Sequence, residues 1–149
     1  MSAQMEKMAS SIEIKIDGNH FLEIYRDKPH QLNKMTPANI HSVELCDGEW
    51  GKEGSVTRWT FTHDGRMMTV TCITGVAKNS VTYRICEGDL LAAYKTMAAI
   101  ISVDKEGDKN LVTWTFEYEK KDESIPNADM LIQLGLSITK DINAYNLNK

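Results

Sequence analysis

Residues 111–142 read LVTWTFEYEKKDESIPNADMLIQLGLSITKDI, and the spacing of the apolar residues changes within this stretch. Over 111–119 every second residue, beginning with Val112, is apolar or aromatic and most of the others are polar, which predicts a strand. After Ile125-Pro126-Asn127 the apolar residues follow a helical stripe, which predicts a helix to about Tyr145. A sheet with one apolar face needs a covering layer, and we expect this long helix to supply it.

The same two-residue alternation recurs throughout the preceding part of the chain. We predict six further strands, over residues 11–17, 40–46, 55–63, 67–74, 81–87 and 97–104. Asp64-Gly65 and Glu106-Gly107-Asp108 are typical of hairpin turns, so neighbouring strands are expected to pair antiparallel. Between the first two strands the apolar spacing predicts short helices over 20–28 and 31–35, separated by Pro29.

This order of elements predicts an α+β fold, with a seven-stranded antiparallel sheet around a long C-terminal helix and two short helices. A chain of 149 residues has the length of one domain and no repeat or linker divides it, so we predict a single domain over 1–149. One helix cannot fill a strongly twisted sheet, and eight methionines suit a deformable apolar pocket. We therefore expect a hydrophobic cavity of roughly several hundred Å3, the usual range for ligand pockets.

Composition and charge exclude several other classes of protein. The net charge of −4 argues against a general nucleic-acid binder, which needs a basic face. The most apolar stretch, 90–101, is too short for membrane insertion, and the first fifteen residues lack the apolar core of a secretory signal. The odd number of widely spaced cysteines indicates free thiols in a reducing compartment: Cys46, Cys72 and Cys86. We expect a cytoplasmic protein that is a monomer or a weak dimer.

Several segments resemble the major latex proteins of plants. They are Lys28-Pro29-His30, PANIHSV at 37–43, GEWGKEGS at 48–55, EGDL at 87–90, Tyr94-Lys95, and the strand from Val112 to Lys120. The matching segments span nearly the whole chain in order, so the chain is identified as a member of this family within the birch-pollen-allergen superfamily. The resemblance implies the START-like helix-grip fold, with a long C-terminal helix over a ligand cavity.

Some activities of that superfamily are not carried over to this chain. The Ser-Gly-Leu-Pro gate of the abscisic-acid receptors is absent, and residues 112–116 contain no lysine like that of the alkaloid-condensing members. No acid–base pair with a basic track for ribonuclease activity is recognisable. The glycines of the loop 48–54 could approach a phosphate, but Glu49 and Glu53 favour a structural hairpin instead.

Strand alternation and the helical stripe also predict which side chains face a ligand, although each could be ordinary core. The predicted ligand-binding residues are Phe21, Tyr25, Trp59, Phe61, His63, Met68, Val70, Tyr83, Ile85, Met97, Ala99, Trp114, Phe116, Met130, Leu131, Leu134, Gly135 and Ile138. His63 and Tyr83 are also candidate catalytic residues, since histidine exchanges protons near pH 7 and a tyrosine hydroxyl can orient a carbonyl or enol. The alternative is an exposed hairpin histidine and a core tyrosine. The four histidines lack ligand spacing, so we predict no metal and no cofactor.

Gly135 lies inside the apolar stripe of the terminal helix, where glycine costs about 0.5–1 kcal/mol relative to alanine. One hypothesis is that the missing side chain leaves room for a ligand. The alternatives are a tight contact between helix and sheet, or a neutral position at the edge of the stripe.

Two functions fit this sequence. The first is binding of a small hydrophobic plant metabolite, in defence or specialised metabolism. The alternative is a cofactor-free isomerase or cyclase acting on a reactive alkaloid or terpenoid intermediate, for example an iridoid, in which a shaped pocket accelerates the reaction through proximity and orientation. The same cavity would serve both functions, so the sequence alone separates them poorly.

Overall fold

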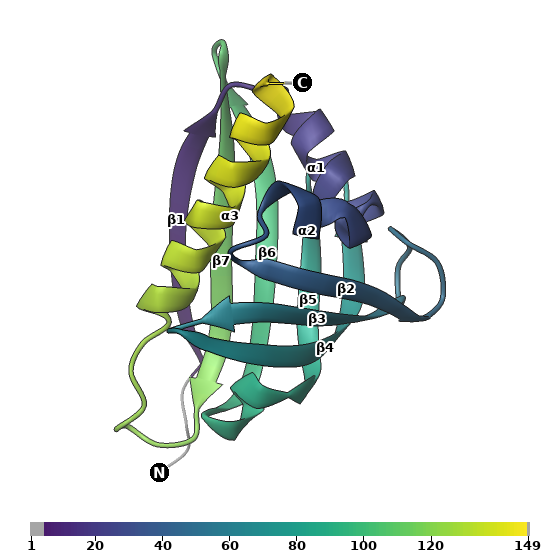
Figure 1. The fold of residues 1–149 in the computed structure, drawn as a ribbon. Helices are drawn as coiled ribbons and strands as arrows, with labels where there is room; N and C mark the ends of the chain where they lie inside the picture. Colours follow the sequence, from purple (N-terminus) through teal and green to yellow (C-terminus); the bar gives the residue numbers. More distant parts are fainter. Residues whose placement is uncertain (1–4, 149) are drawn as a thin grey trace.

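The computed structural model describes residues 5–148 and shows one antiparallel sheet that curves around a long helix (Figure 1). The strands, in sheet order, are β1 (Glu6–Ile14), β7 (Lys109–Lys120), β6 (Tyr94–Glu106), β5 (Ser80–Gly88), β4 (Arg66–Ala77), β3 (Val56–His63) and β2 (Ile40–Asp47). Strands β2 to β7 form a meander and β1 joins it beside β7, so the predicted helix-grip fold is confirmed. Residues 1–4 and 149 lie outside the described residues. The predicted domain includes them, and residues 1–4 also belong to the segment that is predicted to lack a secretory signal.

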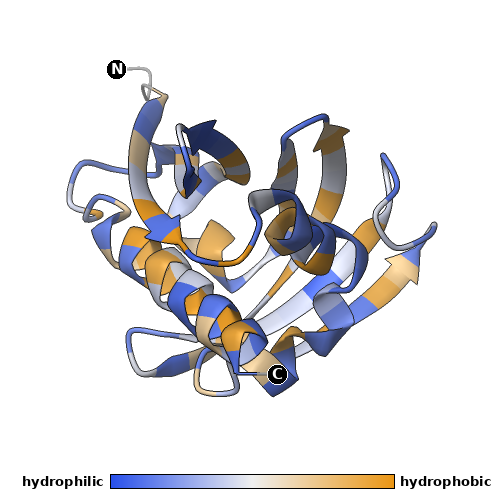
Figure 2. Cartoon of the chain, turned by 90° about the horizontal axis from the view of Figure 1, so that it is seen from above, coloured by the Kyte–Doolittle hydropathy of each residue, from blue (hydrophilic) through white to orange (hydrophobic). Residues whose placement is uncertain are grey.

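The helical elements cover one face of this sheet. They are α1 (Gly18–Asp27), the 3-10 turn η1 (Pro29–Gln31), α2 (Leu32–Met35), the 3-10 turn η2 (Asp89–Ala92) and α3 (Asp129–Leu147). In Figure 1, α3 lies in front of β1 and β7, with α1 and α2 beside its C-terminal half. Apolar residues recur along α3 and alternate with polar residues along the strands, as Figure 2 shows. The buried side of α3 is therefore the side that meets the sheet.

The first strand differs most from its predicted bounds. It begins at Glu6 and ends at Ile14, whereas the alternation predicted residues 11–17. Pairing with β7 is continuous along this strand and includes residues 6–10, which the alternation did not reveal. The backbone N–H groups of Lys15 and Ile16 instead donate to Asn143 Oδ1 on α3, at 2.9 and 3.1 Å. A helix side chain thus replaces the sheet partner, so the strand ends although Ile16 is buried.

The loop between β2 and β3 packs against the end of α1. Gly51 has a φ of +74°, and a Cβ at this position would overlap the carboxylate of Asp27. That carboxylate forms an ion pair of 2.8 Å with Arg26, which lowers the pKa of Asp27 chiefly through the hydrogen bond. The side-chain-free backbone of Gly51 is therefore what lets the loop approach the helix.

Candidate functional site

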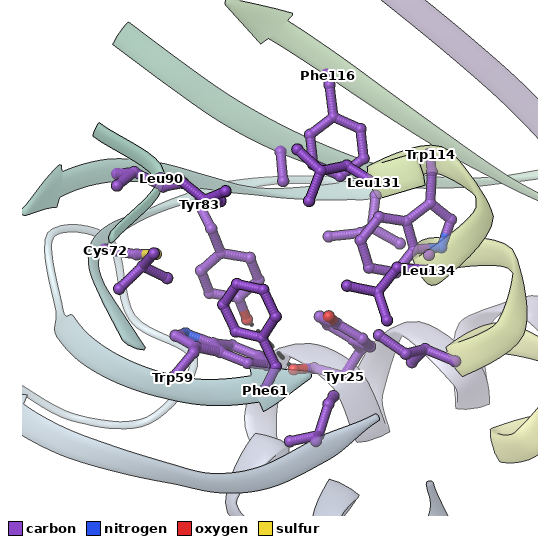
Figure 3. A pocket seen from close by; sticks show the side chains of 17 residues that line it. Tyr25, Trp59, Phe61, Cys72, Tyr83, Leu90, Trp114, Phe116, Leu131 and Leu134 are labelled. Carbon is purple, nitrogen blue, oxygen red and sulfur yellow. Dashed lines mark hydrogen bonds between the residues drawn. The ribbon is translucent and has the colours of Figure 1, made fainter. Parts of the chain in front are cut away.

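The candidate site is a cavity between the inner face of the sheet, α1 and α3 (Figure 3). It is lined by Tyr25, Ile40, Trp59, Phe61, Val70, Cys72, Tyr83, Ile85, Leu90, Ala99, Ile101, Trp114, Phe116, Leu131, Leu134, Gly135 and Ile138. The lining is almost entirely apolar, and it comes from most strands of the sheet and from α1 and α3. Such a surface favours an apolar ligand.

The cavity volume is about 80 Å3, which corrects the expectation of several hundred Å3. Aromatic rings occupy the space that the topology left open. Tyr25 stacks on Trp59 with ring centres 5.6 Å apart and forms a T-shaped pair with Trp114 at 5.5 Å. Trp59 also meets Tyr83 at 4.9 Å in a T-shaped arrangement. A ligand larger than the cavity must therefore displace one or more of these rings.

Most polar atoms at the cavity wall already have partners. The Tyr83 hydroxyl donates to the carbonyl oxygen of Tyr25 at 3.2 Å. In an unbroken helix that carbonyl would accept from residue 29, but Pro29 has no N–H, so Tyr83 takes over this role. Trp114 Nε1 donates to Thr139 Oγ1 at 2.8 Å, and Thr139 in turn donates to the Gly135 carbonyl at 2.9 Å. These bonds stabilise the observed orientations of the Tyr83 and Trp114 rings.

The Tyr25 hydroxyl differs from these polar groups because it lacks a hydrogen-bond partner among the described residues. Tyr25 is buried, and its hydroxyl oxygen has no hydrogen-bond partner among residues 5–148. In Figure 3 Tyr25 lies between Trp59 and Trp114, with the oxygen of its ring directed into the cavity. Burial raises the pKa of this hydroxyl well above its ordinary value, so it stays protonated near neutral pH. The Tyr25 hydroxyl can therefore donate a hydrogen bond to a ligand.

The other ionisable groups of the wall are also neutral near pH 7. Burial raises the pKa of the Cys72 thiol and of the Tyr83 hydroxyl. A thiol that remains protonated is a weak nucleophile. A phenol with a raised pKa can donate a hydrogen bond but does not act as a base at this pH.

Thirteen of the eighteen residues predicted to bind a ligand line this cavity, and five do not. His63 stands at the turn end of β3, beyond Phe61, and burial lowers its pKa. The remaining four, which the structure also places away from the cavity lining, are Phe21, Met68, Met97 and Met130.

Each of these four departures has a packing reason. Phe21 is fully buried on α1 against Tyr25, and Met97 is buried opposite Tyr118 in the sheet. Met68 is half-buried and pairs with Phe61 near the β3–β4 turn, and it is not part of the cavity lining. Met130 is 51% exposed, because the buried side of α3 begins at Leu131. The spacing of apolar residues indicates which face of a strand or helix is buried, but it does not indicate how far along that element the cavity extends.

Four lining residues were absent from the predicted set: Ile40, Cys72, Leu90 and Ile101. Cys72 and Ile101 lie on strand faces that the alternation had already marked as inward. Ile40 opens β2, and strand ends give little periodic signal. Leu90 lies in η2, a short 3-10 turn that no two-residue or helical spacing predicted.

Gly135 faces the sheet at a close contact with Trp114. A Cβ on Gly135 would lie 2.7 Å from Trp114 Cε3 and 2.8 Å from Cγ, both shorter than real Cβ contacts allow. The indole therefore occupies the room that the glycine leaves, which corrects the hypothesis that this room is kept for a ligand. The tight-contact alternative describes the structure better.

Metal binding and membrane insertion can be judged for the described part of the chain. Within residues 5–148 no three His, Cys, Asp or Glu side chains gather as a metal-binding group would require. Among the helices of the same residues, none has both the length and the hydropathy needed to span a membrane.

Comparison with known proteins places this geometry in a family. The model of the pathogenesis-related protein Bet v 1 family matches residues 3–149. MLP-like protein 43 of Arabidopsis thaliana is 34% identical over 98% of this chain and 96% of its own length. MLP-like protein 34 of the same plant is 35% identical over 95% of this chain, which spans only 46% of that relative.

A solved structure agrees with these relatives. The crystal structure of ginseng major latex-like protein 151 from Panax ginseng is 36% identical and superimposes with a TM-score of 0.92. The match covers 96% of this chain and 98% of the ginseng protein. The resemblance to the major latex proteins seen in the sequence is thereby confirmed. This chain belongs to the Bet v 1 family of pathogenesis-related proteins, as a relative of its major latex proteins.

Proposed function

We propose that this protein binds one small, neutral, mainly apolar plant metabolite in the cavity beneath α3. The observation that carries the proposal is the free hydroxyl of Tyr25 in an otherwise apolar lining. A buried donor without a partner gains a hydrogen bond when a ligand offers a carbonyl or ether oxygen. The apolar wall would exclude a charged ligand, because no opposite charge compensates for its desolvation.

The source of the ligand and the cellular compartment of the protein are also part of the proposal. The relatives come from plants, which supports a plant metabolite as the ligand and a role in defence or specialised metabolism. Cys46, Cys72 and Cys86 are free thiols in the structure, which supports a reducing compartment such as the cytoplasm.

A catalytic role as an isomerase or cyclase has weaker support. General acid–base catalysis near neutral pH needs a group whose pKa lies close to that pH. The lining offers Tyr25, Cys72 and Tyr83, each with a raised pKa, while His63 lies outside it. A reaction in this cavity would have to depend on shape and on hydrogen bonding from Tyr25.

The test replaces one hydroxyl at a time. Tyr25→Phe is expected to weaken binding of cyclohexanone about fivefold, the value of one neutral hydrogen bond, and to leave methylenecyclohexane unchanged. The two probes have nearly the same shape, but only the ketone accepts a hydrogen bond. Binding is measured by NMR titration. Because the lost hydroxyl has no partner, the midpoint of thermal unfolding should hold or rise.

Tyr83→Phe is the matched control, since it removes a hydroxyl from the same wall. Here the midpoint should fall by the equivalent of about 1–2 kcal/mol, because the buried Tyr25 carbonyl loses its donor. Equal ketone affinity in wild type and Tyr25→Phe would show that the free hydroxyl does not contact the ligand.

A further inference from the structure

A second pair of buried hydroxyls lies where the β2–β3 loop enters the sheet. Ser55 and Thr74 are each 2% exposed. Neither Ser55 Oγ nor Thr74 Oγ1 has a hydrogen-bond partner among residues 5–148. The backbone holds the two residues opposite each other, since Thr74 N–H donates to the Ser55 carbonyl at 2.9 Å. Two unpartnered hydroxyls side by side in a protein interior call for an explanation, because nearly all such groups are hydrogen-bonded.

These residues continue a row of the cavity wall. Thr74 is the cross-strand partner of Tyr83 on β5, and Tyr83 is in turn the partner of Ala99 on β6. Tyr83 and Ala99 both line the cavity. Cross-strand partners on one face of a sheet lie about 4.5–5.5 Å apart. The hydroxyl pair is therefore one side chain beyond the cavity, behind Tyr83.

The β2–β3 loop packs closely against Ser55. Gly48 has a φ of +83°, and a Cβ there would lie 3.1 Å from Ser55 Cα and 3.2 Å from Ser55 Cβ. Asp27 at the end of α1 lies against Gly51 of the same loop and is paired with Arg26 at 2.8 Å. Their charges are thus already compensated within the protein. The surroundings of Ser55 and Thr74 favour a neutral polar group rather than an anion.

We infer that Ser55 and Thr74 form a second, polar subsite, which takes the terminal hydroxyl of an elongated neutral ligand whose apolar body lies in the main cavity. The inference rests on the proposed function. A ligand hydroxyl can donate to one of the two oxygens and accept from the other, which satisfies both. The ligand reaches them when Tyr83 moves aside, and a cavity of about 80 Å3 already requires such a movement for most ligands.

The experiment compares 1-octanol with 1-fluorooctane, which has nearly the same length but cannot donate a hydrogen bond. The wild-type preference for the alcohol is expected to fall about tenfold in the double variant Ser55→Ala/Thr74→Val. Thr71→Val is the matched control, because Thr71 lies on the same strand but on the opposite face of the sheet. It should leave the preference as in wild type.

The outcomes separate this subsite from the proposed function. If the preference for 1-octanol survives in the double variant and disappears in Tyr25→Phe, the alcohol binds at Tyr25 and the second subsite is refuted. The subsite is also refuted if Ser55→Ala/Thr74→Val changes the affinity for both probes equally. If neither probe binds to the folded wild-type protein, the proposed function itself fails. Circular dichroism of the double variant verifies that it is folded.

Discussion

Replacing Trp114 with alanine is expected to lower the free energy of unfolding by about 3–5 kcal/mol, the usual cost of deleting a large buried aromatic side chain. Trp114 is 4% exposed, donates to Thr139 and lies against the bare backbone of Gly135. It also packs against Tyr25 in a T-shaped arrangement, so its loss removes one wall of the cavity. Urea denaturation followed by circular dichroism measures the change.

Trp50→Ala serves as the control for this variant. Trp50 is half-buried in the β2–β3 loop, where it stacks on His30 with ring centres 4.6 Å apart, and it does not line the cavity. Its removal should cost no more than about 1 kcal/mol. If the two tryptophan variants lose similar amounts of stability, the interior at Trp114 is not packed as described.

Gly135→Leu should lower the free energy of unfolding by about 3 kcal/mol through overpacking, despite the gain in helix propensity. The reason is that even the first atom of the new side chain would overlap the Trp114 indole. Gln133→Leu places the same residue on the exposed side of α3 and should change stability by less than about 0.5 kcal/mol.

The double variant Gly135→Leu/Trp114→Ala tests the contact itself. The leucine can enter the space that the indole vacates, so the double variant should be more stable than the sum of the two single losses predicts, by about 0.5–3 kcal/mol. Strict additivity would mean that Gly135 and Trp114 do not compete for the same space.

The sequence predicted the fold because each strand and each α-helix, though not the 3-10 turn η2, had a periodic signal of its own. The alternation from Val112 to Tyr118 and the stripe from Leu131 to Ile142 were enough to fix a strand and its covering helix. The end of β1 was missed because Asn143, which lies far along the chain, replaces the sheet partner of Ile16. Strand ends depend on such tertiary contacts, and local pattern does not contain them.

The sequence predicted which faces of the strands and helices line the candidate site, but not the volume of the cavity. Inward positions followed from the period, which is why most of the lining was found in advance. How much space remains depends on ring orientations, such as the stacking of Tyr25 on Trp59. The bond from the Tyr83 hydroxyl to the Tyr25 carbonyl, which Pro29 leaves without its helix donor, likewise joins residues far apart in the chain. Such a relation becomes visible only in three dimensions.

The most direct test of ligand binding in this cavity is an NMR titration of the indole N–H signals with cyclohexanone. The chain has three tryptophans, of which Trp59 and Trp114 line the cavity and Trp50 does not. Binding in the cavity predicts that the Trp59 and Trp114 signals shift together, with one ligand per chain, while the Trp50 signal stays in place. A shift confined to Trp50, or no shift of any indole up to the solubility limit of the ketone, would contradict a ligand site beneath α3.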